Sequence, residues 1–374
     1  MFDVVNDDRR QFGFVWPPAA DSTRDDLPQR GEQMRVKRIM IVALAAAACC
    51  LALVACKSGG KESTAVQQGA QGKPPLRIAY SDWPGWVAWE VGIQKGFFKE
   101  AGVNVQFLWF EYAPSMDAFV AGKVDAVAMS NGDTLVNGAN GKKGVMILVN
   151  DYSNGNDMIV ARPGIDSIKA LKGKKVALEI GLLEHLMLET ALKQNGMKIS
   201  DVKLINTPTH QTAQTLASGD VDAIAAWQPN SGQALKAVNG AKAIYTSADA
   251  PGLIYDTLVV DPQSLADRKE DWQKVVKVWY RIYDYIKDPA HEKEVLDIMS
   301  ARVNVPPAEY ATYMKGTRFL SLAEAKEVFK KGDSLKSLYG SSKNADAFNV
   351  ANKVYSKPQN VDEYIDPSFT MNVQ

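Results

Sequence analysis

The chain is poor in the residues that carry covalent and redox chemistry. It has three cysteines in 374 residues, all between positions 49 and 56, and three histidines. Because the cysteines lie in or at the end of one apolar run, the rest of the chain can form no disulfide and has no thiol nucleophile. A Gly-x-Ser-x-Gly elbow, a phosphate-binding loop and a His-Glu-x-x-His pair are also absent. We therefore expect no catalytic residue, no cofactor and no metal site.

The chain also has no excess of either charge. Its 43 Lys and Arg residues balance its 43 Asp and Glu residues. A nucleic-acid-binding protein needs a basic face, so the composition gives no reason to expect such a partner. Without disulfides the stability of the chain must come from the size of its core, and its length suffices for two domains.

The N-terminal part predicts export. Residues 34–55 begin with basic residues, continue as an apolar run too short for a comfortable membrane span, and read as a secretory signal. The run ends in Leu53-Val54-Ala55-Cys56, which resembles a bacterial lipoprotein processing box. We expect lipidation at Cys56, a flexible tether over 56–75, and a location in the periplasm or at the cell surface. An ordinary cleaved signal and an uncleaved anchor are the alternatives. Residues 1–33, polar and acidic, are expected to be a non-native upstream extension.

One short pattern occurs twice. Ala121-Gly122-Lys123-Val124-Asp125-Ala126-Val127-Ala128 is echoed by Ser218-Gly219-Asp220-Val221-Asp222-Ala223-Ile224-Ala225. Each copy predicts a helix that ends at Gly, a short turn and a buried strand, which is the crossover of a parallel α/β sheet. Two copies indicate two sheets of similar build. Since ligands bind beyond the carboxyl ends of such strands, the loops 129–133 and 227–230 are expected to face one cleft.

The hydrophobic pattern alternates between strands and helices along the rest of the chain. It predicts strands at Leu76–Ser81, Val103–Phe110, Val124–Met129, Val145–Val149, Met158–Ala161, Lys175–Leu178, Lys203–Asn206, Ala223–Ala226, Ala243–Tyr245 and Leu253–Val260. It predicts helices at Trp86–Glu100, Pro114–Ala121, Leu183–Gln194, Trp272–Ile286, His291–Ala301 and Leu322–Lys336.

These residues resemble a known family. Asp82-Trp83-Pro84-Gly85-Trp86, the phrase Gly96-Phe97-Phe98-Lys99-Glu100-Ala101-Gly102, and Ala226-Trp227-Gln228-Pro229 are similar to the periplasmic solute-binding proteins of sulfonate, taurine and nitrate ABC importers. The amino-acid sequence around Asp82 and Asp133 more closely resembles a branch of this family that is linked to urea- and guanidine-using pathways.

The resemblance implies an α/β fold with two lobes that form a periplasmic-binding-protein-like clamp, each lobe a mostly parallel sheet flanked by helices. It places lobe 1 at 76–155, lobe 2 at 156–252, and a return crossing followed by a helical C-terminal part of lobe 1 at 253–374. It also implies delivery to a permease with a cytosolic ATPase, and we expect a monomer.

The segments that end the predicted strands are rich in acids and aromatic rings. Sulfonate binders of the family present hydroxyls after an early strand of lobe 2, where this chain has Glu179. Carboxylates with aromatic faces suit a small organic cation, and a planar guanidinium fits them well. We expect the ligand to be guanidine or a related nitrogen compound, with urea second and an anion disfavoured. The residues predicted to bind it are Asp82, Trp83, Trp86, Glu111, Asn131, Asp133, Asp157, Glu179, Trp227 and Asp256.

Several of these residues have simpler interpretations. Asp82 and Asp133 precede helical runs and could cap them, and the tryptophans near Asp82 could be core. Asp125 and Asp222 are interpreted as structural turn residues. The acids and amides of 150–157 lack the terminal Glu of a calcium loop. His185 and Glu189, four apart on a helix, could share a metal, but a solvated face is the favoured interpretation.

Two classes of function remain open. The first is the substrate-binding component of an ABC importer, which delivers a small solute to a permease; a sulfonate, taurine, nitrate or urea ligand is the alternative within it, as is a sensory binding protein. The second is an enzyme like the thiamin-pyrimidine synthases on the same fold. Those enzymes need active-site thiols that the exported part of this chain lacks, so we expect a binding protein and not an enzyme.

Overall fold

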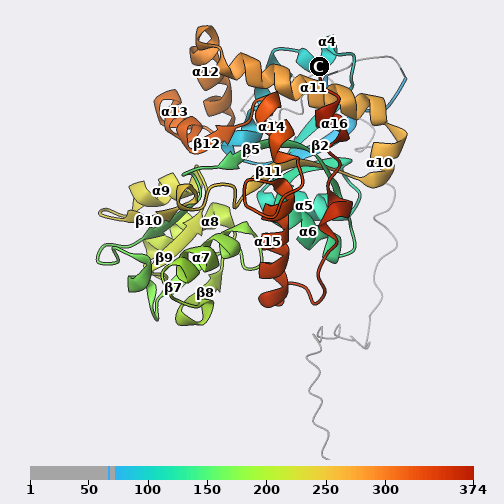
Figure 1. Ribbon diagram of the computed structural model, residues 1–374. Helices are drawn as coiled ribbons and strands as arrows, with labels where there is room; N and C mark the ends of the chain where they lie inside the picture. The colour runs from blue at the N-terminus through green and yellow to red at the C-terminus, as the bar shows by residue number, and fades with distance from the viewer. Residues whose placement is uncertain (1–65, 68–71) are drawn as a thin grey trace, which may run out of the picture. The chain divides into compact units, whose positions relative to one another are not determined.

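Two β-sheets organise the chain, and helices pack against both of them (Figure 1). The computed structural model describes residues 66–67 and 72–374, all of which belong to one compact unit. The expected upstream extension, the signal peptide and Cys56 lie outside the described residues. Within the described part of the chain, no helix is both long and apolar enough to span a bilayer.

The first sheet is mixed, with the strand order β1-β3-β2-β4-β11-β5-β12. Strands β2, β3 and β4 run parallel, whereas β11 lies antiparallel between β4 and β5. β1 and β12 close the two edges, each antiparallel to its neighbour. The strands are β1 Val66–Gln67, β2 Leu76–Tyr80, β3 Val105–Trp109, β4 Ala126–Ser130, β5 Val145–Ser153, β11 Tyr255–Val260 and β12 Thr317–Phe319.

The second sheet has the order β10-β6-β9-β7-β8 and repeats the parallel core of the first. β7 runs parallel to β8 and β9, and β6 lies antiparallel between β9 and β10. Every residue of β9 is buried, as in β4, because helices cover both faces of the sheet. The strands are β6 Met158–Ala161, β7 Lys175–Leu178, β8 Lys203–Asn206, β9 Ala223–Ala226 and β10 Lys242–Thr246.

The chain crosses between the two sheets twice, from β5 to β6 and from β10 back to β11. We call the first sheet with its helices lobe 1, and the second sheet with α7 Leu183–Gln194, α8 Thr209–Ser218 and α9 Asn230–Ala237 lobe 2. The expected two-lobed α/β fold is confirmed. The sheets are more mixed than the pattern predicted, because the strands near each crossing must reverse direction.

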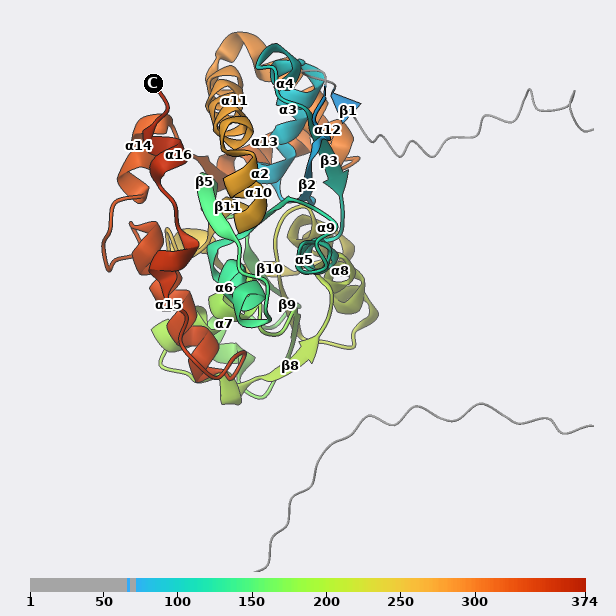
Figure 2. The ribbon, with the colours of Figure 1, turned by 90° about the vertical axis from the view of Figure 1, so that its right-hand side faces the viewer.

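Most helices follow the return to lobe 1 or precede the first crossing (Figure 2). Helix α11 packs against α3 and brings the ring centroid of Trp279 to 4.6 Å from that of Trp89. The helices of lobe 1 are α2 Pro84–Val87, α3 Trp89–Gln94, α4 Phe97–Glu100, α5 Tyr112–Val120, α6 Asn131–Ala139, α10 Pro262–Asp267, α11 Lys269–Lys287, α12 Glu292–Arg302, α13 Pro307–Gly316, α14 Leu322–Val328, α15 Leu338–Ala351 and α16 Ser368–Met371. Short 3-10 helices lie at Ile168–Leu171, Ile199–Asp201, Ser247–Asp249, Pro289–His291 and Val361–Tyr364.

Helix α15 touches both lobes. On the side of lobe 1, the amide of Asn131 in α6 donates to Ser341 of α15 at 3.1 Å. On the side of lobe 2, Phe348 of α15 packs edge-on against His185 of α7, with 5.0 Å between ring centroids. Figures 1 and 2 both show α15 beside α6 and α7. The C-terminal helical part, expected on lobe 1 alone, therefore also contacts lobe 2.

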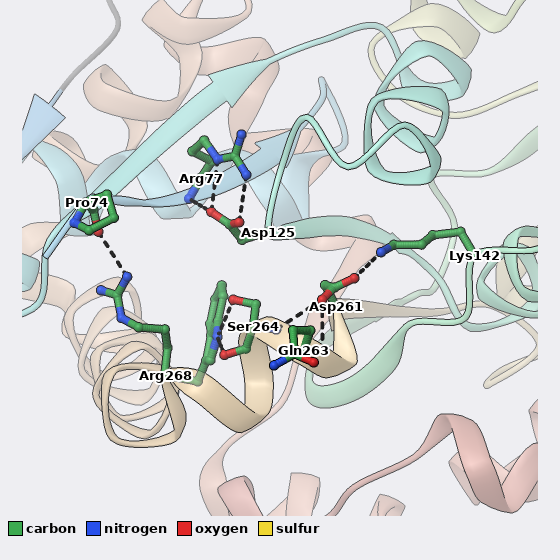
Figure 3. A network of polar contacts seen from close by, with 9 residues as sticks. Pro74, Arg77, Asp125, Lys142, Asp261, Gln263, Ser264 and Arg268 are labelled. Carbon is green, nitrogen blue, oxygen red and sulfur yellow. Dashed lines mark hydrogen bonds and ion pairs between the residues drawn. The ribbon is translucent and has the colours of Figure 1, made fainter.

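The repeated Asp performs the same structural task in both lobes. The Asp125 carboxylate accepts from the backbone N–H of Arg77 at 2.8 Å and also pairs with the Arg77 guanidinium (Figure 3). In lobe 2 the Asp222 carboxylate accepts from the backbone N–H of Lys175 at 2.8 Å. Each Asp thus fixes its turn to the start of the neighbouring strand. The structural interpretation of these two acids is confirmed.

Some predicted elements differ from the structure. The predicted helix Trp86–Glu100 is three short helices, and Gly96, with φ +75°, separates the second from the third. The predicted helix Leu322–Lys336 ends at Val328, before a polar turn. Inside the span expected to be a tether, β1 pairs with β3 at the sheet edge. Strand β12 and helices α10, α13, α15 and α16 were not predicted.

Candidate ligand-binding site

Seven carboxyl groups gather where the two lobes meet. Asp82 follows β2, Asp133 lies in the first turn of α6 after β4, and Glu179 follows β7. The carboxyl ends of parallel strands meet at one edge of a sheet, so these three side chains share one region. Six of the seven are buried and Asp82 is partly buried. The full set is Asp82, Asp133, Asp151, Asp157, Glu179, Glu184 and Asp256.

A small pocket lies within this acidic region. Three indoles and two carboxylates line it, together with Leu183 and Ile254. The space that the centre of a water-sized sphere can reach is ≈ 10 Å³, which is room for about one water molecule. The lining aromatic and acidic residues are Trp83, Trp86, Trp227, Asp157 and Asp256.

The rings of the pocket hold one another in place. Trp86 stacks on Tyr112, with 5.4 Å between centroids and 16° between planes, and Tyr112 meets Trp227 of lobe 2 edge-on at 5.2 Å. The Tyr112 hydroxyl donates to Asp133 at 2.6 Å and accepts from a backbone N–H of Ser130. One tyrosine therefore contacts both of the loops that follow the two copies of the repeat.

Asp82 joins the two lobes next to the pocket residue Trp227. Its two carboxylate oxygens accept from the Trp227 indole N–H and from the Asn230 amide, each at 2.9 Å. Both donors belong to lobe 2, whereas Asp82 belongs to lobe 1. The two contacts therefore bridge lobe 1 and lobe 2 directly.

A glycine makes room for Asp151. The Asp151 carboxylate accepts from the Trp83 indole N–H at 3.0 Å and lies against the backbone of Gly85 in α2. A Cβ at Gly85 would come within 1.8 Å of the Asp151 carboxylate. Close approach of a carboxylate to helix α2 therefore requires glycine at this position.

Burial raises the pKa values of these carboxyl groups. It raises the pKa of Asp82, Asp133 and Asp157 to about 6, because the charged form loses contact with water. It raises the pKa of Asp151 and Glu179 to about 7. Burial, reinforced by neighbouring acids, places the pKa of Glu184 and of Asp256 well above the usual range.

No positive group balances this cluster within the described residues. None of the seven carboxylates forms an ion pair with Lys, Arg or His in that part of the chain. Buried oxygens without a hydrogen-bond partner occur on Asp151, Asp157, Glu179, Glu184 and Asp256. Orphaned buried acceptors of this kind are costly unless a ligand supplies donors.

The structure places most of the predicted ligand residues at this site, but two lie elsewhere. The side-chain NH₂ group of Asn131 donates hydrogen bonds to the hydroxyls of Ser341 and Ser342. Its side-chain oxygen accepts from the Tyr255 backbone N–H at 3.1 Å. Glu111 is exposed at the start of α5, where it faces His210 of lobe 2 at 3.4 Å. Asn131 thus supports the packing of α15, and Glu111 contributes to the rim.

The helix-cap interpretation of two acids is wrong. The side chain that caps α6 is Ser130, which accepts from the backbone N–H of Asp133. Trp83 occupies the N-cap position of α2, and Asp82 comes one residue before it. The Asp82 carboxylate instead accepts a hydrogen bond from Trp227 of lobe 2. Trp83 and Trp86 are buried, in agreement with their interpretation as core residues. They also line the pocket.

The solvated face expected for His185 and Glu189 is also wrong. Both residues are buried, because α15 covers this side of α7. Glu189 accepts from Asn352, just after α15, at 2.6 Å. The described residues contain no group of three or more His, Cys, Asp or Glu side chains that could hold a metal ion.

Two acids of the site were not among the predicted ligand residues. Glu184 lies in the first turn of α7, fully buried beside Asp157. Asp151 belongs to the segment 150–157, which is rich in acids and amides. Its hydrogen bond to the pocket residue Trp83 shows that its side chain lies beside the pocket. Glu184 follows Glu179 after one short loop, in the first turn of the next helix. This spacing could have predicted that Glu184 belongs to the same site as Glu179.

Comparison with known proteins assigns the chain to a family. Residues 69–300 match the NMT1-like family, and the chain belongs to it. A Brucella abortus (strain 2308) protein named "Putative binding protein" is 25% identical over 300 residues, which are 79% of this chain and 92% of that protein. The periplasmic aliphatic sulphonate binding protein SsuA from Escherichia coli superposes with a TM-score of 0.65 at 18% identity, over 80% of this chain and 100% of its own.

An enzyme shares this fold too. The desulfurization enzyme DszB superposes with a TM-score of 0.57 at 14% identity, over 79% of this chain and 98% of its own. At such identities the likeness shows the fold, which serves binding and catalysis alike. The ligand has to be inferred from the pocket.

Proposed function

We propose that this protein is the extracytoplasmic substrate-binding component of an ABC importer, and that it captures a small nitrogen-containing cation such as guanidinium between its lobes. The two-lobed fold and the relatives named as binding proteins support the transport role. In this proposal lobe 1 comprises 76–155 and 253–374, and lobe 2 comprises 156–252. The ligand stabilises the closed arrangement because only that arrangement brings both sets of contacts together.

The composition of the pocket carries the proposal. Three indole rings and two carboxylates surround a space too small for a large solute. Indole faces attract cations, and a carboxylate can accept two parallel N–H bonds from a planar guanidinium. The unpartnered oxygens of Asp157 and Asp256 are acceptors that such a ligand would satisfy.

The same charges disfavour an anion. The Escherichia coli protein of this fold is a sulphonate binder. In the present chain Glu179 follows β7, and it has no cationic partner among the described residues. A sulfonate or nitrate would meet several carboxylates without a compensating charge. Urea, which is neutral but offers similar N–H donors, is the second candidate ligand.

The proposal extends to location and partners. A lipid on Cys56 would hold the protein at a membrane in the periplasm or at the cell surface, where it would deliver its ligand as a monomer to a permease with a cytosolic ATPase. Replacing Cys56 with Ser is expected to release the protein from the membrane fraction. An unchanged distribution would remove the lipid anchor and leave the binding role intact.

The ligand is tested by calorimetric titration of the purified protein with guanidinium, urea, taurine, nitrate and a small alkanesulfonate. We expect guanidinium to bind in the micromolar range, about −8 kcal/mol, and the anions not to bind. Asp157→Asn should abolish guanidinium binding, while the matched variant Asp222→Asn, far from the pocket in the repeat, should retain it. Binding of an anion instead would keep the transport role and overturn the cation.

A further inference from the structure

Two pairs of carboxyl groups lie together at the pocket. Asp256 of β11 and Asp151 of β5 are register partners, and paired residues of adjacent strands point to the same face of a sheet. Asp157, directly before β6, lies close to Glu184 in the first turn of α7, and each affects the titration of the other. One member of each pair, Asp256 or Asp157, lines the pocket.

The surroundings of both pairs are acidic on every side. Asp256 faces Asp151, Asp157 and Asp133, and Glu184 faces Asp157, Glu179 and Asp133. The phenol of Tyr310 lies near Asp151. The neighbouring His185 has a pKa lowered by burial, so its ring is neutral near pH 7. None of the four paired acids has a cationic partner among the described residues.

Two carboxylates so close together in a buried site cannot both be ionised. One proton between them removes the repulsion and turns one acid into a hydrogen-bond donor to the other. The acids whose environment opposes ionisation most strongly are Glu184 and Asp256. Asp256 and its register partner Asp151, each with an Oδ2 atom that has no other hydrogen-bond partner in the described residues, are therefore the pair that would share a proton in the ligand-free cleft.

We propose that Asp256 is a specificity-determining residue which makes capture a one-for-one exchange, in which a monovalent cation enters the cleft and the proton shared with Asp151 leaves it for bulk water. The O–H bond of one carboxyl group breaks, its electron pair remains on the carboxylate, and no bond of the ligand changes. The charge of the cleft is the same before and after. This inference rests on the proposed cation-binding function.

The exchange explains how so acidic a site can select a ligand by its charge. Neutral urea brings no charge to replace the proton, so it finds a protonated, less complementary pocket. A dication of the same size would have to displace two protons. A monovalent cation matches the loss of one proton, and its affinity should fall as protons compete at low pH.

The test is titration of the purified protein with guanidinium chloride in two buffers of different ionisation enthalpy. The dependence of the apparent enthalpy on the buffer gives the number of protons released. We expect about one proton per guanidinium near pH 7, and a Kd that rises up to tenfold per pH unit on acidification. In Asp256→Asn the release should fall, while Asp222→Asn should behave like the wild type.

The wild-type protein alone decides the outcome if a variant does not fold. Guanidinium binding with no proton released and a Kd independent of pH between 5 and 8 would overturn the exchange and leave the proposed function standing. Absence of guanidinium binding at any pH would instead overturn the proposed function.

Discussion

The indole N–H of Trp227 and the carboxylate of Asp82 meet across the two lobes at 2.9 Å. The donor follows β9 in lobe 2, and the acceptor follows β2 in lobe 1. Trp227 comes directly after the strand of the second copy of the repeat, and Asp82 comes two residues after the end of β2. The contact therefore links two strand ends that are far apart in the sequence.

Trp227→Phe should weaken ligand binding without removing the ring that packs against Tyr112. A hydrogen bond to a charged group contributes about 1.5–3 kcal/mol, so Kd should rise by roughly 10- to 100-fold. Calorimetry with guanidinium measures the change. The matched control is Trp272→Phe, which loses indole bonds to Ser264 away from the cleft and should lower thermal stability with Kd unchanged. Equal Kd values for wild type and Trp227→Phe would show that this contact does not stabilise closure.

Gly85→Ala should impair the site although alanine favours helices by about 1 kcal/mol over glycine. The new methyl group would collide with the Asp151 carboxylate and break its bond to Trp83. We expect lower thermal stability and loss of guanidinium binding. Adding Asp151→Ser to Gly85→Ala removes the collision, so the double variant should regain stability but not affinity. A stable, fully active Gly85→Ala protein would contradict the close packing seen here.

Glu179→Ala should weaken a cation far more than it affects any anion. One oxygen of Glu179 accepts from the Thr209 backbone N–H at 3.3 Å, and the other has no partner in the described residues. Removing the carboxylate deletes a charge that is available to the ligand, and the expected rise in the Kd of guanidinium is about tenfold or more. Titration of the variant with guanidinium and with nitrate compares the two effects. Unchanged cation affinity would remove Glu179 from the site.

Much of the architecture was readable in the sequence because lobe 2 follows simple rules. The predicted elements Lys175–Leu178, Leu183–Gln194 and Ala223–Ala226 agree with the structure to the residue. The two strands are short apolar segments, and the helix stops before Asn195 and Gly196. The strand-end location of the candidate site was predicted from the same pattern, since Asp82, Asp157 and Trp227 all lie near a strand end.

The remainder depends on tertiary contacts that leave no periodic signal. Helix α15 buries serine and asparagine side chains against α6, so it shows no apolar stripe to predict it. The burial of Glu184 depends on which face of α7 turns toward the cleft, and α15 determines what covers the rest of that helix. Asn131 has the residue type of a ligand contact, but its hydrogen bonds are already used within the protein.

Asp125→Asn should destabilise the protein and leave its affinity unchanged. The carboxylate holds the backbone and side chain of Arg77 at the edge of the sheet opposite the cleft (Figure 3). Losing a charge-assisted bond of this kind costs about 1.5–3 kcal/mol. Chemical unfolding and calorimetry with guanidinium separate stability from binding. A shift in Kd comparable to that of Asp157→Asn would show that the two edges of the sheet are not independent.

The ligand-free protein should lose stability as pH rises from about 5 to 8. Asp82, Asp133 and Asp157 have folded-state pKa values of about 6, and Asp151 and Glu179 of about 7, whereas unfolded acids titrate near 4. Between those limits the folded protein binds more protons than the unfolded chain, so the free energy of unfolding decreases with pH.

Thermal denaturation between pH 5 and pH 8, with and without guanidinium at non-denaturing concentration, measures this effect. Because the cation replaces the missing positive charge, it should raise Tm more at pH 8 than at pH 5. Asp151→Asn removes one of the shifted groups and should flatten the profile of the free protein. A ligand-free Tm that stays constant between pH 5 and pH 8 would mean that the acidic cleft is hydrated and open in solution, since exposure to water returns these carboxyl groups to their ordinary titration near pH 4.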